Sequence, residues 1–274
     1  MEYLTHSGFV NYAPPAVIYD GSTVGWYSYD ASLTLTSDSS VSRWADRLGS
    51  GRDLIQDTST KKPKWTGEGI LFDGVDDYLA AAFTLTKPET IYIVVNPVSW
   101  TAFDTIFDGY LNYSNIQQFN VTPVIRTFAF GSSSATGNLS LKTPHIIRVV
   151  YNSLESSMQI DNGALSTFDG SSNINIGGIV LAANYTKASQ FSNIKVKELI
   201  VRNTADSSIV RNDIYNYLYN KHFVSNTVPS IIYDGNTVAW YDYQDPSMLI
   251  TADSSVSRWY DKLKSGRDLI QDVS

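Results

Sequence analysis

The sequence of 274 residues has no cysteine, three histidines and only 17% charged residues. The absence of cysteine excludes disulfides and thiolate metal sites. The histidines are too far apart along the chain to form a metal-binding motif; they are His6, His145 and His222. No stretch approaches about 18 apolar residues, and the N-terminus lacks the basic start and apolar centre of a signal peptide. We therefore expect no membrane insertion.

Recognisable catalytic patterns are also missing. The sequence has no G-x-S-x-G, no G-x-x-x-x-G-K and no H-E-x-x-H. The formal net charge is −7, and an acidic surface disfavours nucleic acid as a partner. The sequence therefore predicts a protein that is not an enzyme, needs no cofactor and binds no nucleic acid.

The most informative feature that is present is an internal repeat. The segment IYDGSTVGWYSYD at 18–30 returns as IYDGNTVAWYDYQ at 232–244. The segment DSSVSRWADRLGSGRDLIQDTS at 38–59 returns at 253–274, with 18 of 22 residues identical. Such identity indicates a duplicated domain whose second copy is incomplete in this sequence.

The repeat divides the chain into four parts: an N-terminal segment at 1–13 that resembles the tail of an earlier repeat, a complete domain at 14–223, a linker at 224–231 and a partial second domain at 232–274. A β fragment of this size cannot close its own core. We expect the chain to be a piece of a longer tandem array, with the partial copy disordered or ordered by a partner. A decayed gene is the alternative.

The complete domain is predicted to be mostly β. Runs rich in Val and Ile, bounded by turn residues, indicate strands; they lie at 90–98, 145–152, 157–168 and 193–201. The Asn-Gly pair at 162–163 is typical of a tight hairpin turn. Many short strands with glycine-bearing turns favour a two-sheet antiparallel sandwich, and periodicity leaves jelly-roll and immunoglobulin-like topologies open.

One helix is predicted over 206–223. Ser207 or Ser208 can cap its first amide groups. Its apolar side chains fall on one face; they are Val210, Ile214, Tyr217 and Leu218. The helix should therefore pack against the sandwich at the end of the domain.

Two motifs resemble a known family. VSRWADRLGSGRDLIQ, followed by KPKWTGEGILFDGVDDYLAA, resembles the concanavalin A-like, laminin-G-type lectin/glucanase domain, and the resemblance covers residues 18–222. It implies an all-β jelly-roll sandwich of two antiparallel sheets with one short C-terminal helix, but it fixes no chemistry. Glycosidases of this family carry closely spaced carboxylates in an E-x-D-x-x-E pattern, and no glutamate here has an acidic residue two positions further on.

Several residues are predicted to hold the fold together. Trp26 and Trp44 recur as Trp240 and Trp259, and residues kept in both copies favour core packing over ligand stacking. Asp46 is expected to accept backbone hydrogen bonds in the turn that follows it. The family motif adds two further structural residues, Phe72 and Gly74.

The acidic motif FDGVDDYL allows two interpretations. Asp73, Asp76 and Asp77 are oxygen ligands of the kind that Ca²⁺ prefers, although three carboxylates do not complete its coordination shell. The favoured interpretation is a turn whose carboxylates bond to its own amides. Calcium is the only cofactor that the sequence allows us to name.

Ligand binding is predicted in SWTAFDTIFDGYLNYSNIQQF at 99–119. Aromatic faces among polar side chains suit sugar rings, and the candidate residues are Trp100, Phe103, Tyr110 and Tyr113. The alternative is that these aromatics belong to the core or touch a neighbouring subunit.

Tandem lectin-like domains without cysteine or signal peptide favour a virion protein, such as a phage fibre, tail or head decoration. Repeated domains give many weak contacts at once. The expected partners are other virion proteins, copies of the chain itself and cell-surface glycans. One alternative is a secreted or cell-surface bacterial module that binds carbohydrate, and a second is a cryptic glycosidase on the same fold.

Overall fold

The computed structural model describes residues 13–30, 32–120, 123–129, 134–170 and 175–224, and a few strands of the second copy at 249–250, 256–259 and 268–270. The chain divides into two units, of which the larger spans residues 11–224. The terminal segment at 1–12 and the linker residues 225–231 lie outside the described residues. The four-part domain division therefore stays a prediction.

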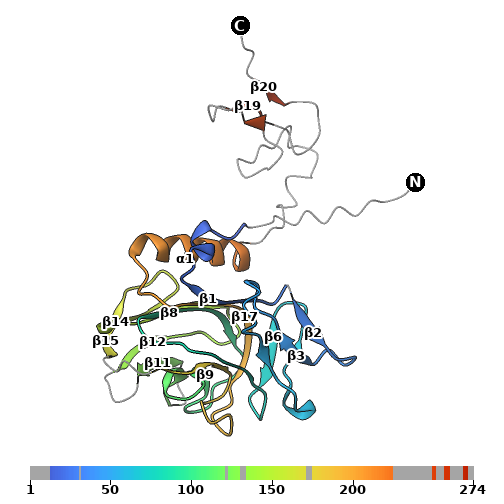
Figure 1. Cartoon of the computed structure of the whole chain (residues 1–274), viewed down its shortest axis with the longest axis vertical. Coiled ribbons are helices and arrows are strands. Elements are labelled where there is room, and N and C mark those ends of the chain that lie inside the picture. Colours follow the sequence, from blue (N-terminus) through green and yellow to red (C-terminus); the bar gives the residue numbers. More distant parts are fainter. Residues whose placement is uncertain are drawn as a thin grey trace. The chain divides into compact units, whose positions relative to one another are not determined.

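The first sheet of the larger unit has eight strands (Figure 1). Its order is β15 (Ser166–Gly170), β14 (Ser153–Ile160), β13 (His145–Tyr151), β8 (Glu89–Pro97), β17 (Asn193–Arg202), β6 (Ile70–Asp73) and β5 (Lys64–Trp65), with β1 (Thr23–Ser28) also paired to β17. One end of β17 pairs with β6 and the other with β1. β6 and β1 therefore lie end to end along one side of β17.

The second sheet has nine strands. Its order is β12 (Ser134–Asn138), β11 (Val124–Ala129), β10 (Ser114–Gln118), β9 (Thr105–Gly109), β16 (Gly178–Leu181), β7 (Leu79–Ala82), β4 (Leu54–Ile55), β3 (Val41–Trp44) and β2 (Leu33–Leu35). Neighbouring strands in both sheets pair antiparallel. The predicted all-β sandwich of two antiparallel sheets is confirmed.

The main core fills the space between the sheets. Strand β8 shows how it forms: Ile91, Ile93 and Val95 face this core, whereas Tyr92 and Val94 face the opposite side of the sheet. Burying each such aliphatic side chain contributes roughly 1.5–3 kcal/mol. Because β8 is buried on both faces, its sequence is a continuous apolar run and not an alternating one.

A second core lies under α1 (Ser208–His222), which crosses the outer face of the eight-stranded sheet beside η1 (Ala16–Tyr19) (Figure 1). Ser207 caps the helix by accepting a hydrogen bond from the amide of Val210 at 3.4 Å. Three of the predicted apolar side chains are buried, namely Ile214, Tyr217 and Leu218. A further 3-10 turn, η2, spans Ser59–Lys61. Among the described residues, no helix has the length and hydropathy needed to cross a membrane.

A buried carboxylate joins the helix to the sheet. Glu198 of β17 is fully buried and accepts hydrogen bonds from the side chains of Trp26 (2.7 Å), Tyr217 (2.8 Å) and His222 (2.7 Å). Lys221 adds an ion pair at 2.8 Å. Burial works to raise the pKa of Glu198, but the His222 hydrogen bond and the Lys221 charge outweigh it and hold this pKa at about 2.

A buried arginine stands at the end of β17. Arg202 donates to the carbonyl of Val17 at 2.7 Å and to the hydroxyl of Thr23 at 2.8 Å. It also pairs with Asp20 at 2.9 Å and with Asp206 at 2.8 Å. One guanidinium thus ties the start of the domain to the end of its last strand.

The predicted structural residues of the first copy lie in or beside the cores. Trp44 is fully buried and donates its indole N–H to the carbonyl of Ser28 at 2.9 Å, and Phe72 lies in the same core. Asp46 accepts from the amides of Trp26 (2.9 Å) and Leu48 (3.2 Å).

The second copy repeats a local structure of the first. Its strands are β18 (Leu249–Ile250), β19 (Val256–Trp259) and β20 (Leu269–Ile270). Arg258 pairs with Asp268 at 2.7 Å and Trp259 lies opposite Leu269, just as Arg43 pairs with Asp53 and Trp44 lies opposite Leu54. Trp240 lies outside the described residues. The need of this copy for a partner stays a prediction.

Candidate binding site

The four aromatic candidates do not form one cluster. Trp100 lines a pocket. Phe103 lies beside the guanidinium of Arg126, at 5.5 Å from ring centre to Cζ. Tyr110 and Tyr113 contact a different loop, which follows β16. The segment 99–119 therefore contributes to separate places on the nine-stranded sheet and its rim.

The pocket beside Trp100 has a volume of about 480 Å³, within the range of small-molecule sites. Its lining comes from the loop after β8 and from the ends of β11 and β12; the residues are Trp100, Pro123, Asn138, Leu139, Ser140 and Leu141. The indole Nε1 of Trp100 is buried and has no hydrogen-bond partner among the described residues. Because this nitrogen is shielded from solvent, the Trp100 ring offers the pocket apolar surface and not a donor.

One wall of the pocket is held by a histidine. The backbone N–H of Ser140 donates to Nε2 of His145 at 2.9 Å, and Nδ1 of the same ring lies 2.9 Å from Asp161. Asp161 also accepts from the amide of Ile146 at 2.9 Å. His145 begins β13 and Asp161 follows β14, so two paired strands position the segment that carries Ser140.

Tyr110 and Tyr113 meet the loop after β16. Tyr113 packs edge-on against Tyr185, with ring centres 4.4 Å apart, and the ammonium of Lys187 lies 3.7 Å from the ring centre of Tyr110. The role of Tyr110 and Tyr113 in ligand binding stays a prediction. The two tyrosines are half-buried, and they hold two loops together.

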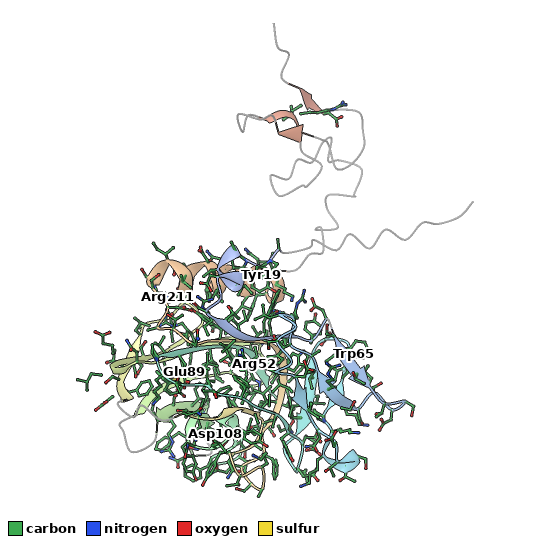
Figure 2. The ribbon with its side chains drawn as sticks, viewed as in Figure 1. Tyr19, Arg52, Trp65, Glu89, Asp108 and Arg211 are labelled. Atoms are coloured by element: carbon green, nitrogen blue, oxygen red, sulfur yellow. The ribbon has the colours of Figure 1, made fainter. Side chains whose placement is uncertain are left out.

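A buried aspartate fixes the same two loops. Asp108 of β9 accepts hydrogen bonds from the amides of Ser114 (3.1 Å) and Tyr185 (2.9 Å). Burial raises its pKa to about 7, although these amide bonds act in the opposite direction. Asn115 lies beside Asp108 on the neighbouring strand, by extension of the pairing of Ile116 with Phe107. Figure 2 shows Asp108 within the nine-stranded sheet.

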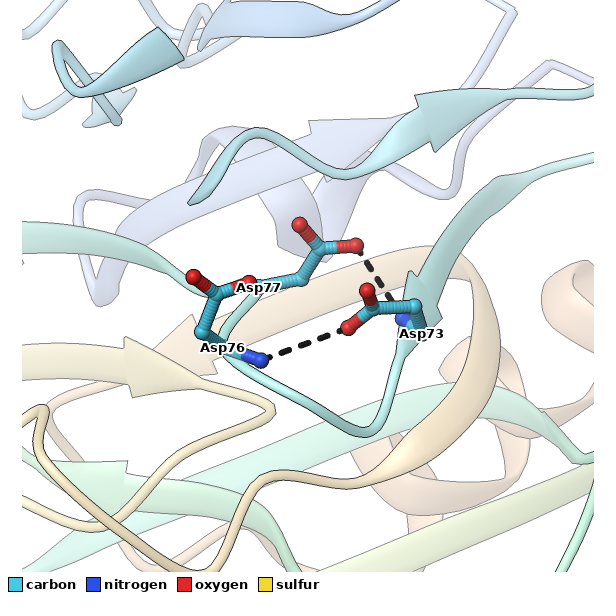
Figure 3. A group of neighbouring side chains, drawn as sticks. All are labelled: Asp73, Asp76 and Asp77. Carbon is cyan, nitrogen blue, oxygen red and sulfur yellow. Dashed lines mark hydrogen bonds between the residues drawn. The ribbon is translucent and has the colours of Figure 1, made fainter. Parts of the chain in front are cut away.

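The acidic motif forms a turn (Figure 3). Asp73 accepts from the amides of Val75 (2.8 Å) and Asp76 (3.4 Å), and Asp77 accepts from the amide of Asp73 (3.0 Å). Gly74 has a φ of +78°, which glycine adopts at little cost. One oxygen each from Asp73, Asp76 and Asp77 lies within 4.8 Å of the others.

These carboxylates fit a calcium ion only in part. Asp73 and Asp77 already use one oxygen each on backbone amides, and Ca²⁺ takes six to eight oxygen ligands. Burial and then the charge of Asp73 raise the pKa of Asp77 to about 6.

Sequence reasoning identified Trp100 but missed the rest of its pocket. Leu139, Ser140 and Leu141 follow β12 without an aromatic or charged signal. His145 was set aside because it has no histidine nearby in the sequence. The one usable signal was Asp161 in the predicted hairpin turn, since the antiparallel pairing of β13 with β14 places it opposite Ile146, beside His145.

No family model matches the chain, and no curated protein matches it. Solved structures do match. A Trypanosoma rangeli sialidase mutant displaying trans-sialidase activity aligns with a TM-score of 0.54 and 12% identity, over 77% of this chain and 34% of that one. The botulinum neurotoxin serotype G binding domain aligns with a TM-score of 0.50 and 12% identity, over 72% of this chain and 51% of that one.

The chain thus corresponds to about a third of the sialidase chain and about half of the toxin chain. At this identity the likeness shows a shared β-sandwich fold and leaves function open. The concanavalin A-like family assignment therefore stays a prediction.

Proposed function

We propose that this chain is a carbohydrate-binding module of an adhesion protein, and that its glycan site is the pocket beside Trp100. The observation that carries the proposal is a pocket of about 480 Å³ that the ring of Trp100 lines together with Asn138 and Ser140. Sugars combine apolar C–H faces with hydroxyl groups that donate and accept. A site for them needs an aromatic or apolar wall and a few polar groups.

The lining supplies both kinds of group. Trp100, Leu139 and Leu141 offer apolar surface, and Asn138 and Ser140 offer polar side chains at the same rim. The amide of Asn138 can accept and donate, as a vicinal pair of hydroxyls requires.

We propose that the module binds glycans without hydrolysing them. Asp108 has a raised pKa, a property that catalytic acids share. However, its two carboxylate oxygens accept hydrogen bonds from the amides of Gly109, Ser114 and Tyr185. The carboxylate therefore holds two loops together. The competing hypothesis of a cryptic glycosidase predicts sugar release that Asp108→Asn abolishes.

We place the module in a tandem array on a phage virion, as a fibre, tail or head decoration of the concanavalin A-like, laminin-G type. The repeated sequence supports this proposal, because linked copies of a weak site bind a surface by avidity. A secreted bacterial surface protein is the alternative. A reading frame for a capsid or tail protein beside the gene favours the virion, whereas a sorting signal on the complete gene favours secretion. The acidic turn is proposed to work without a metal.

The binding proposal is tested with the whole chain on a glycan array. Trp100→Ala should weaken binding by at least about tenfold, as loss of a central aromatic anchor does. Trp65→Ala is the matched control, because Trp65 is 38% exposed on β5 of the other sheet (Figure 2). Circular dichroism must show both variants folded. Equal binding by Trp100→Ala, or no glycan binding by the parent chain, rejects the proposal.

A further inference from the structure

The backbone of the pocket wall is hydrogen-bonded to one imidazole. Nε2 of His145 accepts the backbone N–H of Ser140 at 2.9 Å, so Nε2 must carry a lone pair. The ring proton is then on Nδ1, where it donates to Asp161 at 2.9 Å. This tautomer follows from the Ser140 contact alone, because a backbone N–H can only donate.

Adding a proton to the ring changes its two contacts in opposite ways. A protonated Nε2 meets the N–H of Ser140, and two donors cannot bond to each other. On the other side, the imidazolium forms a charge-assisted bond with Asp161. One contact is therefore lost while the other strengthens, which lets the ring stay in place as the Ser140 segment leaves it.

The groups around the ring allow this change. Asp161 is the carboxylate that faces it, at 2.9 Å from Nδ1. Tyr215 of α1 lies near Asp161, and its pKa is raised by burial and then by the charge of Asp161. Lys142, on the segment that leads into β13, is exposed. The imidazole itself is largely buried, with 11% of its side chain exposed.

We propose that His145 positions the Ser140 wall of the Trp100 pocket and makes binding there sensitive to acid. The neutral ring holds the segment Leu139–Leu141 in the arrangement that forms the pocket, and protonation releases it. This regulation rests on the proposed glycan function for its biological meaning. The structural change itself can be measured without any ligand.

The first measurement follows the free protein by nuclear magnetic resonance between about pH 5 and pH 8, where imidazoles change charge. The amide resonance of Ser140 should shift with the same midpoint as the ring carbons of His145. Its amide should also exchange faster with solvent on the acid side, because its acceptor is lost. In His145→Gln, whose side-chain oxygen can accept but does not titrate, the Ser140 resonance should be independent of pH.

The second measurement repeats the glycan array at about pH 5 and about pH 8. Binding by the parent chain should be roughly five- to tenfold weaker at the acid end, and His145→Gln should lose this difference.

The outcomes separate the two proposals. The proposal for His145 is wrong if the amide resonance of Ser140 does not change with pH together with the ring carbons of His145. It is also wrong if glycan binding by the parent chain and by His145→Gln has the same pH dependence. A parent chain that binds no glycan at any pH rejects the function, while the resonance measurement still decides whether the wall responds to His145.

Discussion

Trp44 lies between the two sheets, fully buried, with its ring edge-on to Tyr27 at 6.0 Å and its N–H bonded to the carbonyl of Ser28. Trp44→Ala should lower the free energy of unfolding by about 3–5 kcal/mol, as removal of a large buried aromatic does. Urea denaturation measures this loss. Trp65→Ala should cost less than about 1 kcal/mol, because Trp65 is partly exposed. A loss below about 1 kcal/mol at Trp44 contradicts its role in the core.

Glu89 is a buried carboxyl in the interior of the sandwich (Figure 2). Neither of its oxygens has a hydrogen-bond partner among the described residues. Burial raises the pKa of Glu89 to about 8, although the charge of Lys87 lowers it somewhat. The carboxyl is therefore protonated at neutral pH, and its ionisation disfavours the folded state.

The raised pKa of Glu89 makes the folded state less stable as pH rises. Between its ordinary pKa and about 8, the folded protein holds a proton at Glu89 that the unfolded chain has released, so stability falls as pH rises. Glu89→Gln should remove this contribution, on the order of 5 kcal/mol across the range. Unfolding curves of both proteins at several pH values measure it. Glu155→Gln, at an exposed position, should show no such change. Parallel curves for Glu89→Gln and the parent chain contradict the prediction.

At the scale of elements, α1 depends on a charge pair as well as on its apolar face. Lys221→Met should cost about 3–5 kcal/mol, because it leaves the buried Glu198 without its cation. The matched control is Lys195→Met, whose partner Glu68 is exposed and whose loss should cost less than about 1 kcal/mol. Thermal and urea unfolding measure both variants. Equal losses contradict the prediction.

Low pH should also weaken the ion pair between Glu198 and Lys221. Because the pKa of Glu198 is held at about 2, its contribution to stability is present above the ordinary pKa of a glutamate and is lost as pH falls towards 2. In Lys221→Met the loss should begin at a higher pH. Adding Glu198→Gln to Lys221→Met should recover part of the stability, since no buried charge then remains.

The elements themselves follow closely from local sequence. The run at 90–98 forms β8, the run at 193–201 forms β17, and the predicted helix over 206–223 forms α1. The hairpin turn at Asp161 joins β14 to β15. Local signals sufficed because each element has its own period, turn residue or cap. Glu198 shows the limit of these local signals. The alternating pattern of the segment around it marks a strand, but nothing nearby in the sequence predicts that the Glu198 carboxylate binds the end of a helix.

The binding pocket was harder to predict for a related reason. Trp100 and the segment Leu139–Leu141 are far apart in the sequence, and they meet only after β8 pairs with β13. The sequence singles out Trp100 as a candidate ligand-binding residue. It does not identify the wall opposite, because that wall consists of leucines and a serine with no distinctive pattern.

At the scale of the whole molecule, the larger unit contains its own cores. The buried residues of both clusters lie between Ile18 and Leu218. Deleting residues 232–274 should therefore leave the melting temperature of the remaining domain unchanged within about 2 °C. Differential scanning calorimetry measures this, and light scattering measures the oligomer size. A lower melting temperature, or a loss of assembly, means that the second copy supports the first.

The two buried charge groups have a mechanical consequence for a chain under tension. Thr23 at the start of β1 lies opposite Arg202 at the end of β17. A force that pulls on the two termini of the domain would therefore separate these strands one residue pair at a time, beginning at Thr23 and Arg202. Arg202 bridges that end to Val17, Asp20 and Thr23. Glu198 holds the last turn of α1, where the chain leaves the domain. A pulling force would therefore act on these ion pairs, where it enters and leaves the domain, before it reaches the hydrophobic interior.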